Sequence, residues 1–564
     1  MASFRNVQLS KWVIWIPFGI ILAALVAAPI LSVVLTSFRS ESSSLSPDNY
    51  IQVFASARNW RAIWHTAVMG IAVVVVCILL AAPAAWLVAR TDIPAPGFIR
   101  LSIISAFVIP PYLLAVGWIL LGGPNAGLVN RLWTSLTGAA SGPIDVFTFE
   151  GLVFVMAAHL FSLIFVFTSN ALEYVPSELE EAAAILGATR WQTFWSATFP
   201  LVMPAFLSAI IITFLQAIAL FAVPALIALP AKYSVLSLQL YQFFEFPPRV
   251  GEAAAYSVPL LALTAMLIWL QRRILGRRGY TTIAGKGGRR QLTRLGVLRW
   301  PLFVLMTLLL AATTFAPTLV LVIAAFSKAW ALGFSPGNTT LDNFRYVLFE
   351  HTTALRSLTN TAIFATAASV IALAIAFTAA YMTERKLVPF SKALAMLCMT
   401  PIVIPGLILS IGFYATYAGP PFLLYGSGLI LILAFTTRFL PLAFANSVAG
   451  LRSVDADMEH AVRILGGTRF TAIRAVTAPI LKTNLFSGFI LLFVPASQEV
   501  ATAVFLSAPA TVVTSVVLLN MTEEGNISQV AALGTILLAL TLIVIGVGRG
   551  LVGRNLALRS EPGA

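Results

Sequence analysis

Long apolar runs alternate with short polar segments along the whole chain. A helix that crosses a bilayer needs roughly 20 apolar residues, and inside the bilayer a helix satisfies every backbone group by itself. Runs of this kind lie at about 12–36, 63–89, 98–121, 149–170, 202–229, 253–271, 301–326, 357–383, 393–416, 424–447, 481–508 and 529–548. The pattern therefore predicts an all-α polytopic membrane protein with about 12 transmembrane helices.

Prolines interrupt some of these runs. Pro110 and Pro111 in one third span, and Pro401 and Pro405 in the other, are expected to break helix hydrogen bonds, which would either shape a gate or only kink packed helices. The proline-containing runs at 202–229 and 481–508 are long enough for a single span or for one span plus a re-entrant segment. The first run lacks a small-residue cleavage pattern, so we expect it to remain as a helix.

The two halves of the chain are copies of each other. AAWLVAR at 84 corresponds to AAYMTER at 379, and FVIPPYLLAVGW at 107 corresponds to IVIPGLILSIGF at 402, with an offset of about 295 residues. After a longer loop in the first half the offset falls to 279, which pairs Gly187 with Gly466. Matches in one order indicate duplication. Six spans in each copy give both copies one orientation, so a pathway is expected between them.

Charge then gives the topology. The chain is 59% hydrophobic and 10% charged, with a net charge of +14. Residues 271–299 hold nine Lys or Arg and no Asp or Glu, which predicts a cytoplasmic loop. We expect a first repeat at 1–272, a basic linker at 273–299 and a second repeat at 300–564. Counting spans from the linker places both termini in the cytoplasm, and basic residues near the ends agree: Arg5, Lys11, Arg549, Arg554 and Arg559.

Composition also excludes some classes. No basic stripe interleaved with aromatic residues lies outside the membrane flanks, so nucleic acid is not an expected partner. Cys77 and Cys398 sit inside apolar runs and are interpreted as small core residues. The string AGKGG at 284 lacks the upstream Gly and the following Ser or Thr of a phosphate-binding loop, and no catalytic or metal-ligating constellation is recognised, so neither an enzyme nor a cofactor or metal site is expected.

Two matching polar segments fall on the predicted cytoplasmic side. They read EEAAAILGATRWQTFWSATFPL at 180–201 and EHAVRILGGTRFTAIRAVTAPI at 459–480. Acidic residues at the start complement a helix dipole, and Gly187 or Gly466 lets the chain turn. Each segment should form a short helix, a bend and a lead-in to the fifth span. Amphipathic anchors on a membrane surface favour basic faces, so two acidic-led copies favour a docking surface for a soluble partner.

The stretch EAAAILG at 181–187 resembles the EAA motif of type I ABC importer permeases, and the resemblance extends over nearly the whole chain. It implies two tandem six-helix permease repeats whose polar loops are coupling helices that fit clefts of an ATPase subunit. His460 stands where the motif has Glu, so we expect the first loop to couple more strongly. The residues carried over are Glu180, Glu181, Ala182, Ala183, Gly187, Glu459, His460, Ala461 and Gly466.

A fused two-copy chain is most similar to the ferric-iron transport permeases, with permeases for thiamine, aminoethylphosphonate, polyamines or sugar phosphates as alternatives. The resemblance implies a bacterial inner-membrane protein surrounded by lipid. Its implied partners are a homodimeric ABC ATPase, which uses the ATP, and a periplasmic substrate-binding protein.

A few polar residues fall at membrane depth, where burial is costly and function is the default hypothesis. For Arg438, a pathway role stands beside pairing with Glu499 or capping helix carbonyls. For His159, hydrogen-bonded packing is favoured over metal ligation. A secondary transporter would need coupling carboxylates within the spans, and only Glu499 qualifies. The full set is His159, Gln216, Arg438, Gln498 and Glu499.

Overall fold

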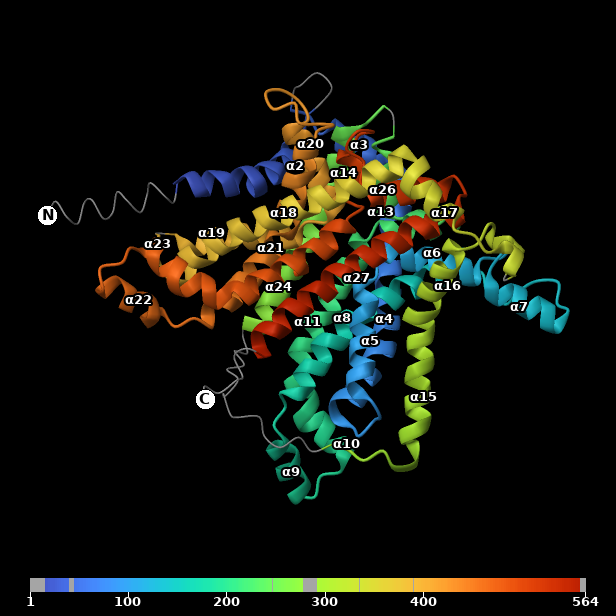
Figure 1. The fold of residues 1–564 in the computed structure, drawn as a ribbon, viewed down its shortest axis with the longest axis horizontal. Helices are drawn as coiled ribbons and strands as arrows, with labels where there is room; N and C mark the ends of the chain where they lie inside the picture. Colours follow the sequence, from blue (N-terminus) through green and yellow to red (C-terminus); the bar gives the residue numbers. More distant parts are fainter. Residues whose placement is uncertain are drawn as a thin grey trace.

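The computed structural model describes residues 16–39, 45–245, 247–276, 292–333, 335–388 and 390–557. Within these residues ten helices are long and apolar enough to cross a membrane, and two bent helix pairs raise the number to twelve (Figure 1). The prediction of an all-α polytopic membrane protein is confirmed. The basic residues Arg5, Lys11 and Arg559, and linker residues 277–291, lie outside the described residues.

Six spans fall in each half. The first half holds Ile16–Ser37 (ending in α2, Ala28–Ser37), α4 (Ala57–Arg90), the pair α5 (Pro96–Val108) and α6 (Pro111–Gly122), α8 (Phe149–Glu173), Arg190–Ala219 (ending in α11, Phe199–Ala219) and α14 (Val250–Gly276). The second half holds Gly296–Ala325 (α15, Arg299–Leu310, to α16, Ala316–Ala325), α18 (Thr352–Glu384), the pair α19 (Ser391–Met399) and α20 (Gly406–Tyr417), α21 (Gly428–Arg452), Arg469–Ser497 (ending in α24, Ala478–Ser497) and α27 (Ile527–Ala557).

Shorter helices connect the spans. On the side of the polar segments lie α9 (Ser177–Ile185) and α22 (Ala456–Ile464), which are labelled at the bottom and left of Figure 1. The opposite side carries short helices that the apolar pattern did not predict, because they are too short or too polar to give a clear periodicity. They are α3 (Asp48–Ala55), α7 (Leu128–Thr137), α12 (Ala222–Ile227), α13 (Leu236–Gln242), α17 (Asp342–Arg345), α25 (Ala503–Leu506) and α26 (Thr514–Glu523).

The third spans are broken at their prolines. The helix axes of α5 and α6 meet at 101°, and the corresponding angle in the second half is 114°. A proline has no backbone N–H and its ring clashes with the preceding turn, so a helix bends or ends there. The predicted interruption of hydrogen bonding at Pro110, Pro111, Pro401 and Pro405 is therefore present as a sharp bend in both repeats.

The fifth spans differ from their predicted bounds. Their helices begin at Arg190 and Arg469, well before the predicted starts at 202 and 481, because a π-helical turn just before Pro200 and Pro479 lets the helix pass each proline. At the other end α11 stops at Ala219 and α24 at Ser497, and short separate helices α12 and α25 follow. Each run is thus one span followed by a short helix.

The two repeats interlock through their first spans. α16 of the second repeat packs against α6 of the first, and α2 of the first repeat packs against α20 of the second. The approach is close enough that a Cβ on Gly117 would stand 2.4 Å from the carbonyl oxygen of Pro317, and one on Gly412 would stand 2.6 Å from that of Pro29. Only glycine allows backbones to meet at such distances. Neither repeat therefore completes its packing alone.

The end of the linker lies on the same side as α9. The Thr293 N–H donates to the carbonyl of Arg90 at 2.8 Å, and the Leu295 N–H donates to the Asp92 carboxylate at 2.8 Å. Arg90, the last residue of α4, in turn contacts Glu180 of α9. The predicted grouping of linker and polar segment on one side is present in the structure.

Candidate functional site

The helix α9 is short because its sequence specifies both ends. Glu178 and Glu180 lie in its first turn, where negative charge is favourable, and Gly187 ends it with a φ of +84°. The Ala188 N–H donates to the Ala183 carbonyl and the Gly187 N–H to the Ala184 carbonyl, both at 3.0 Å, which is a Schellman ending. Thr189 and Gln192 then form a capping box that starts the fifth span.

The second repeat builds α22 in the same way. The Asp455 carboxylate accepts from the Asp457 N–H at the helix start, and Gly466 ends the helix with a φ of +87°. The Gly467 N–H donates to the Val462 carbonyl at 3.0 Å. A Cβ placed on Gly187 or Gly466 would meet nothing within 4 Å, so the positive φ alone requires glycine. Both repeats thus contain the predicted short helix, bend and lead-in.

A buried ion pair ties α9 to the second span. Arg90 Nη2 lies 3.1 Å from Glu180 Oε1, with side chains 3% and 25% exposed respectively. Glu180 also accepts a 2.7 Å hydrogen bond from Thr198 Oγ1 at the start of the fifth span, while Arg90 donates to the Val175 carbonyl at 3.3 Å. One carboxylate therefore joins α9, α4 and the base of α11.

The second repeat repeats this network and extends it. Glu459 Oε1 lies 2.9 Å from Arg385 Nη2 and accepts from Thr477 Oγ1 at 2.8 Å, while Glu459 Oε2 accepts from the Tyr381 hydroxyl at 2.8 Å. Burial by itself would favour the neutral acid, but the hydrogen bonds from Arg385, Tyr381 and Thr477 and the charge of Arg385 outweigh it, so the pKa of Glu459 lies below its usual value. Glu459 stays ionised in its buried position.

These contacts follow the pairing that the repeat offset of 279 gives the two motifs. Glu459 corresponds to Glu180, since both face inward onto an arginine and a threonine, whereas Glu181 corresponds to His460 and both of those side chains are exposed. The offset of 295 likewise pairs Arg90 with Arg385.

The outward faces of α9 and α22 end in the same apolar pair. Ile185 and Leu186 are 85% and 87% exposed, and Ile464 and Leu465 have the same exposed fractions. Of the other motif residues, Ala182 and Ala461 are exposed and Ala183 is half-buried. Two large aliphatic side chains so exposed just before a glycine turn are suited to enter a cleft on another protein. Sequence reasoning missed them, although the string ILG occurs in both repeats.

Histidine and arginine cap the broken third spans. His159 Nδ1 lies 3.2 Å from the carbonyl of Ala106, whose usual helical donor is missing because the residue four positions on is Pro110. At the matching place, Arg438 Nη1 donates to the Ile404 carbonyl at 2.6 Å. Of the roles weighed for these residues, the structure shows hydrogen-bonded packing for His159 and carbonyl capping for Arg438.

Two more of the predicted polar residues lie at the same breaks. Gln498 of the second repeat donates from Nε2 to the Val108 carbonyl of the first repeat at 3.1 Å. Glu499 Oε1 accepts from the Thr502 backbone and hydroxyl, both at 3.0 Å, beside Gly406 at the start of α20. Gln216 lies half-buried on α11. The breaks therefore collect four of the five intramembrane polar residues, while their part in a pathway remains a prediction.

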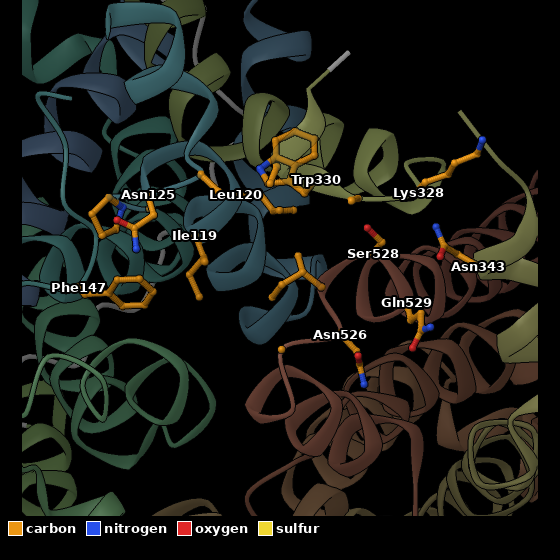
Figure 2. A pocket seen from close by; sticks show the side chains of 17 residues that line it. Ile119, Leu120, Asn125, Phe147, Lys328, Trp330, Asn343, Asn526, Ser528 and Gln529 are labelled. Carbon is orange, nitrogen blue, oxygen red and sulfur yellow. The ribbon is translucent and has the colours of Figure 1, made fainter. Parts of the chain in front are cut away.

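A cavity of about 480 Å³ opens on the side opposite α9, between the repeats. Figure 2 shows Leu120 and Asn125 of the first repeat on one side of it and Ser528 and Gln529 of the second repeat on the other. Arg131 of α7 closes one edge by donating to the carbonyls of Trp330 and Ala331 at 3.1 and 3.0 Å. Polar side chains of both repeats thus line one mouth.

Comparison with known proteins adds a family. Residues 81–280 match the model of the "Binding-protein-dependent transport system inner membrane component". The chain is 27% identical over 447 residues to the ferric transport system permease protein FbpB of Actinobacillus pleuropneumoniae, across 78% of this chain and 64% of that protein. It is 31% identical over 175 residues to the molybdenum transport system permease protein ModB of Azotobacter vinelandii, across 30% of this chain and 74% of that protein.

The coverage of the ferric relatives is incomplete. A second one, the putative ferric transport system permease protein FbpB 1 of Haemophilus influenzae, is 26% identical over 72% of this chain and 63% of its own length. The aligned part is thus just under two thirds of both ferric relatives. A putative 2-aminoethylphosphonate permease, PhnV of Salmonella paratyphi A, is 27% identical over 41% of this chain and 86% of its own length.

Proposed function

Because this chain belongs to the inner-membrane components of binding-protein-dependent transport systems, we propose that it forms a two-repeat permease of an ABC importer. The translocation path lies between the repeats, and α9 and α22 are the coupling helices. The observation that carries this assignment is the pair of matching helices on one side, each with an exposed Ile–Leu end and a buried glutamate tied to the second span.

The side that carries α9 and α22 is cytoplasmic in this proposal, and so are both termini. A basic linker between the repeats favours that orientation. A homodimeric ATPase, which uses the ATP, offers one cleft to each helix. When the ATPase subunits move together on binding ATP, the ion pairs transmit the displacement of each helix to α4 and α18. Because the ATPase contacts α9 and α22 differently with and without ATP, it shifts the equilibrium between the inward-open and outward-open states of the permease.

On the opposite side, a periplasmic substrate-binding protein delivers the cargo to the mouth between the repeats. We propose ferric iron as that cargo, because two relatives that align along most of this chain are ferric transport permeases. The choice of ferric iron rests on the relatives alone, because a fold does not identify the cargo. It is tested by reconstituting the chain with its ATPase and binding protein in liposomes and measuring uptake of radiolabelled ferric iron. ATP-dependent uptake of 2-aminoethylphosphonate without uptake of iron would show that the phosphonate, and not ferric iron, is the cargo.

The docking role has its own test. Replacing Ile185 and Leu186 by Asp places charges where an apolar cleft is expected, so co-purification of the ATPase with the permease should fall at least tenfold, as for the loss of an interface anchor. The matched control is Leu136→Asp on α7, which changes an equally exposed side chain, 83% exposed, on the far side. Unchanged ATPase binding in the double variant would refute the coupling role, and transport that needs a proton gradient and no ATP would favour a secondary transporter.

A further inference from the structure

A second cavity, of about 230 Å³, lies beside α22 and is lined mainly by charged side chains. Four cations face it: Arg385, Lys386, Arg463 and Arg469. Its two carboxylates are already paired, because Glu459 binds Arg385 and Glu384 lies 3.1 Å from Arg452. Lys386, Arg463 and Arg469 form no ion pair within the described part of the chain. The cavity therefore holds uncompensated positive charge.

The first repeat is built differently at the same place. The repeat offsets align Lys386 with Thr91 and Arg463 with Ala184. There the end of the linker closes the position, through Leu295 N–H to the Asp92 carboxylate at 2.8 Å and Thr293 N–H to the Arg90 carbonyl at 2.8 Å. The motif does not require all four cations, since the first repeat has Thr91 and Ala184 at two of their positions. The second repeat carries positive charge at a position that the end of the linker occupies in the first repeat.

The position of the cavity limits which ligands can reach its positively charged side chains. Arg385 is the residue after α18, a candidate membrane span, so the cavity lies at the end of a span on the side of α22. Basic pockets at the cytoplasmic ends of spans bind the headgroups of anionic lipids, and arginine forks match phosphate oxygens in geometry and charge. Lys386 and Arg463 stand exposed at this cavity, free to reach a ligand.

We propose that this cavity binds a phosphate group, supplied in the membrane by the headgroup of an anionic phospholipid of the leaflet that faces α22. The bound phosphate neutralises Lys386, Arg463 and Arg469 and fixes α22 against the end of α18. In solution, inorganic phosphate has the same chemistry and is the other source. The assignment of the leaflet as cytoplasmic rests on the proposed orientation, whereas the binding itself does not depend on the ATPase.

The test uses the full chain in detergent, titrated with phosphatidylglycerol and followed by native mass spectrometry. The double variant Lys386→Thr/Arg463→Ala installs the first-repeat residues and leaves the Arg385–Glu459 pair intact. At about 1 kcal/mol for each basic residue near a charged headgroup, the affinity of the tightest lipid site should fall about 30-fold. Arg190→Ala, at the first-repeat position equivalent to Arg469, is the control and should leave that affinity unchanged.

Two further arms identify the source of the phosphate. Phosphatidylcholine, whose phosphate is balanced by a cation, should bind the same site at least tenfold more weakly than phosphatidylglycerol if the lipid headgroup is the ligand. If inorganic phosphate raises the thermal midpoint of the native chain and not of the double variant, free phosphate also fills the site. Equal binding of every probe to both chains would overturn the proposal. So would loss of ATPase co-purification in the double variant with lipid binding unchanged, which would make the occupant a protein.

Discussion

At the scale of single residues, the inward-facing carboxylates of Glu180 and Glu459 decide how firmly α9 and α22 are held. Removing Glu459 leaves Arg385 buried without its partner, and breaking a buried pair in this way costs about 3–5 kcal/mol. Glu459→Ala should therefore increase hydrogen exchange along α22 and lower the thermal midpoint. Because the pKa of Glu459 lies below its usual value, its contribution is present at neutral pH and is lost as the pH falls through that lowered pKa.

Glu180→Ala should have the same effect on α9 with a smaller loss, since the Glu180 side chain is 25% exposed and that of Glu459 is 8% exposed. The control is Glu178→Ala, which removes an exposed carboxylate from the same helix. A loss from Glu178→Ala as large as that from Glu180→Ala would show that general helix charge, rather than the ion pair, is what matters.

The capped carbonyls at the broken spans give a second residue-scale prediction. His159→Leu leaves the Ala106 carbonyl buried without a donor, which should cost about 1–3 kcal/mol, seen as a lower thermal midpoint in detergent. Arg438→Leu should lower the thermal midpoint in the same way, because it removes the donor to the Ile404 carbonyl. Arg438→Lys keeps a donor there and should lower the midpoint less. An equal decrease of the thermal midpoint in the two Arg438 variants would mean that Arg438 does not stabilise the chain through its hydrogen bond to the Ile404 carbonyl.

At the scale of elements, the glycine endings of α9 and α22 are equivalent in geometry. An alanine at Gly187 or Gly466 meets no neighbour and bears only the cost of the left-handed conformation, about 1–2 kcal/mol. Both Gly→Ala variants should therefore weaken ATPase co-purification by similar factors. Gly138→Ala imposes the same backbone cost at the end of α7 and should leave ATPase binding unchanged. A much smaller decrease of ATPase co-purification for Gly466→Ala than for Gly187→Ala would contradict this prediction. It would instead support the weaker coupling of the second loop that the sequence predicts.

The sequence predicts these elements well where the signal is local. Apolar runs, prolines and a glycine after an acidic helix are each properties of one short stretch, so the spans, the broken third spans and the short helices α9 and α22 were all predicted. The inward direction of Glu180 was not, because its partner Arg90 comes from another helix and nothing in EEAAAILG distinguishes one glutamate from the next. The extended start of the fifth span at Arg190 was missed because a π-helical turn has no sequence signature of its own.

At the scale of the whole molecule, the repeats depend on each other for packing. Gly117→Val would drive a side chain into the Pro317 backbone, and we expect it to separate α16 from α6. The clearest measurement is to express residues 1–272 and 300–564 as two chains and purify one through an affinity tag. The native halves should co-purify without the linker, and the Gly117→Val pair should not. Gly97→Ala, which meets nothing within 4 Å, should behave as the native pair does, and co-purification of the Gly117→Val halves would refute the contact.

This exchange of first spans also sets an order for biogenesis. The ribosome makes α2 early, and α14 of the same repeat can cover one part of it, yet α20, which covers another part, is made only later in the chain. The part of α2 that contacts α20 must therefore face lipid until the second repeat arrives. Joining both repeats in one polypeptide guarantees that the awaited helix is always delivered beside it, in equal number and in the right orientation.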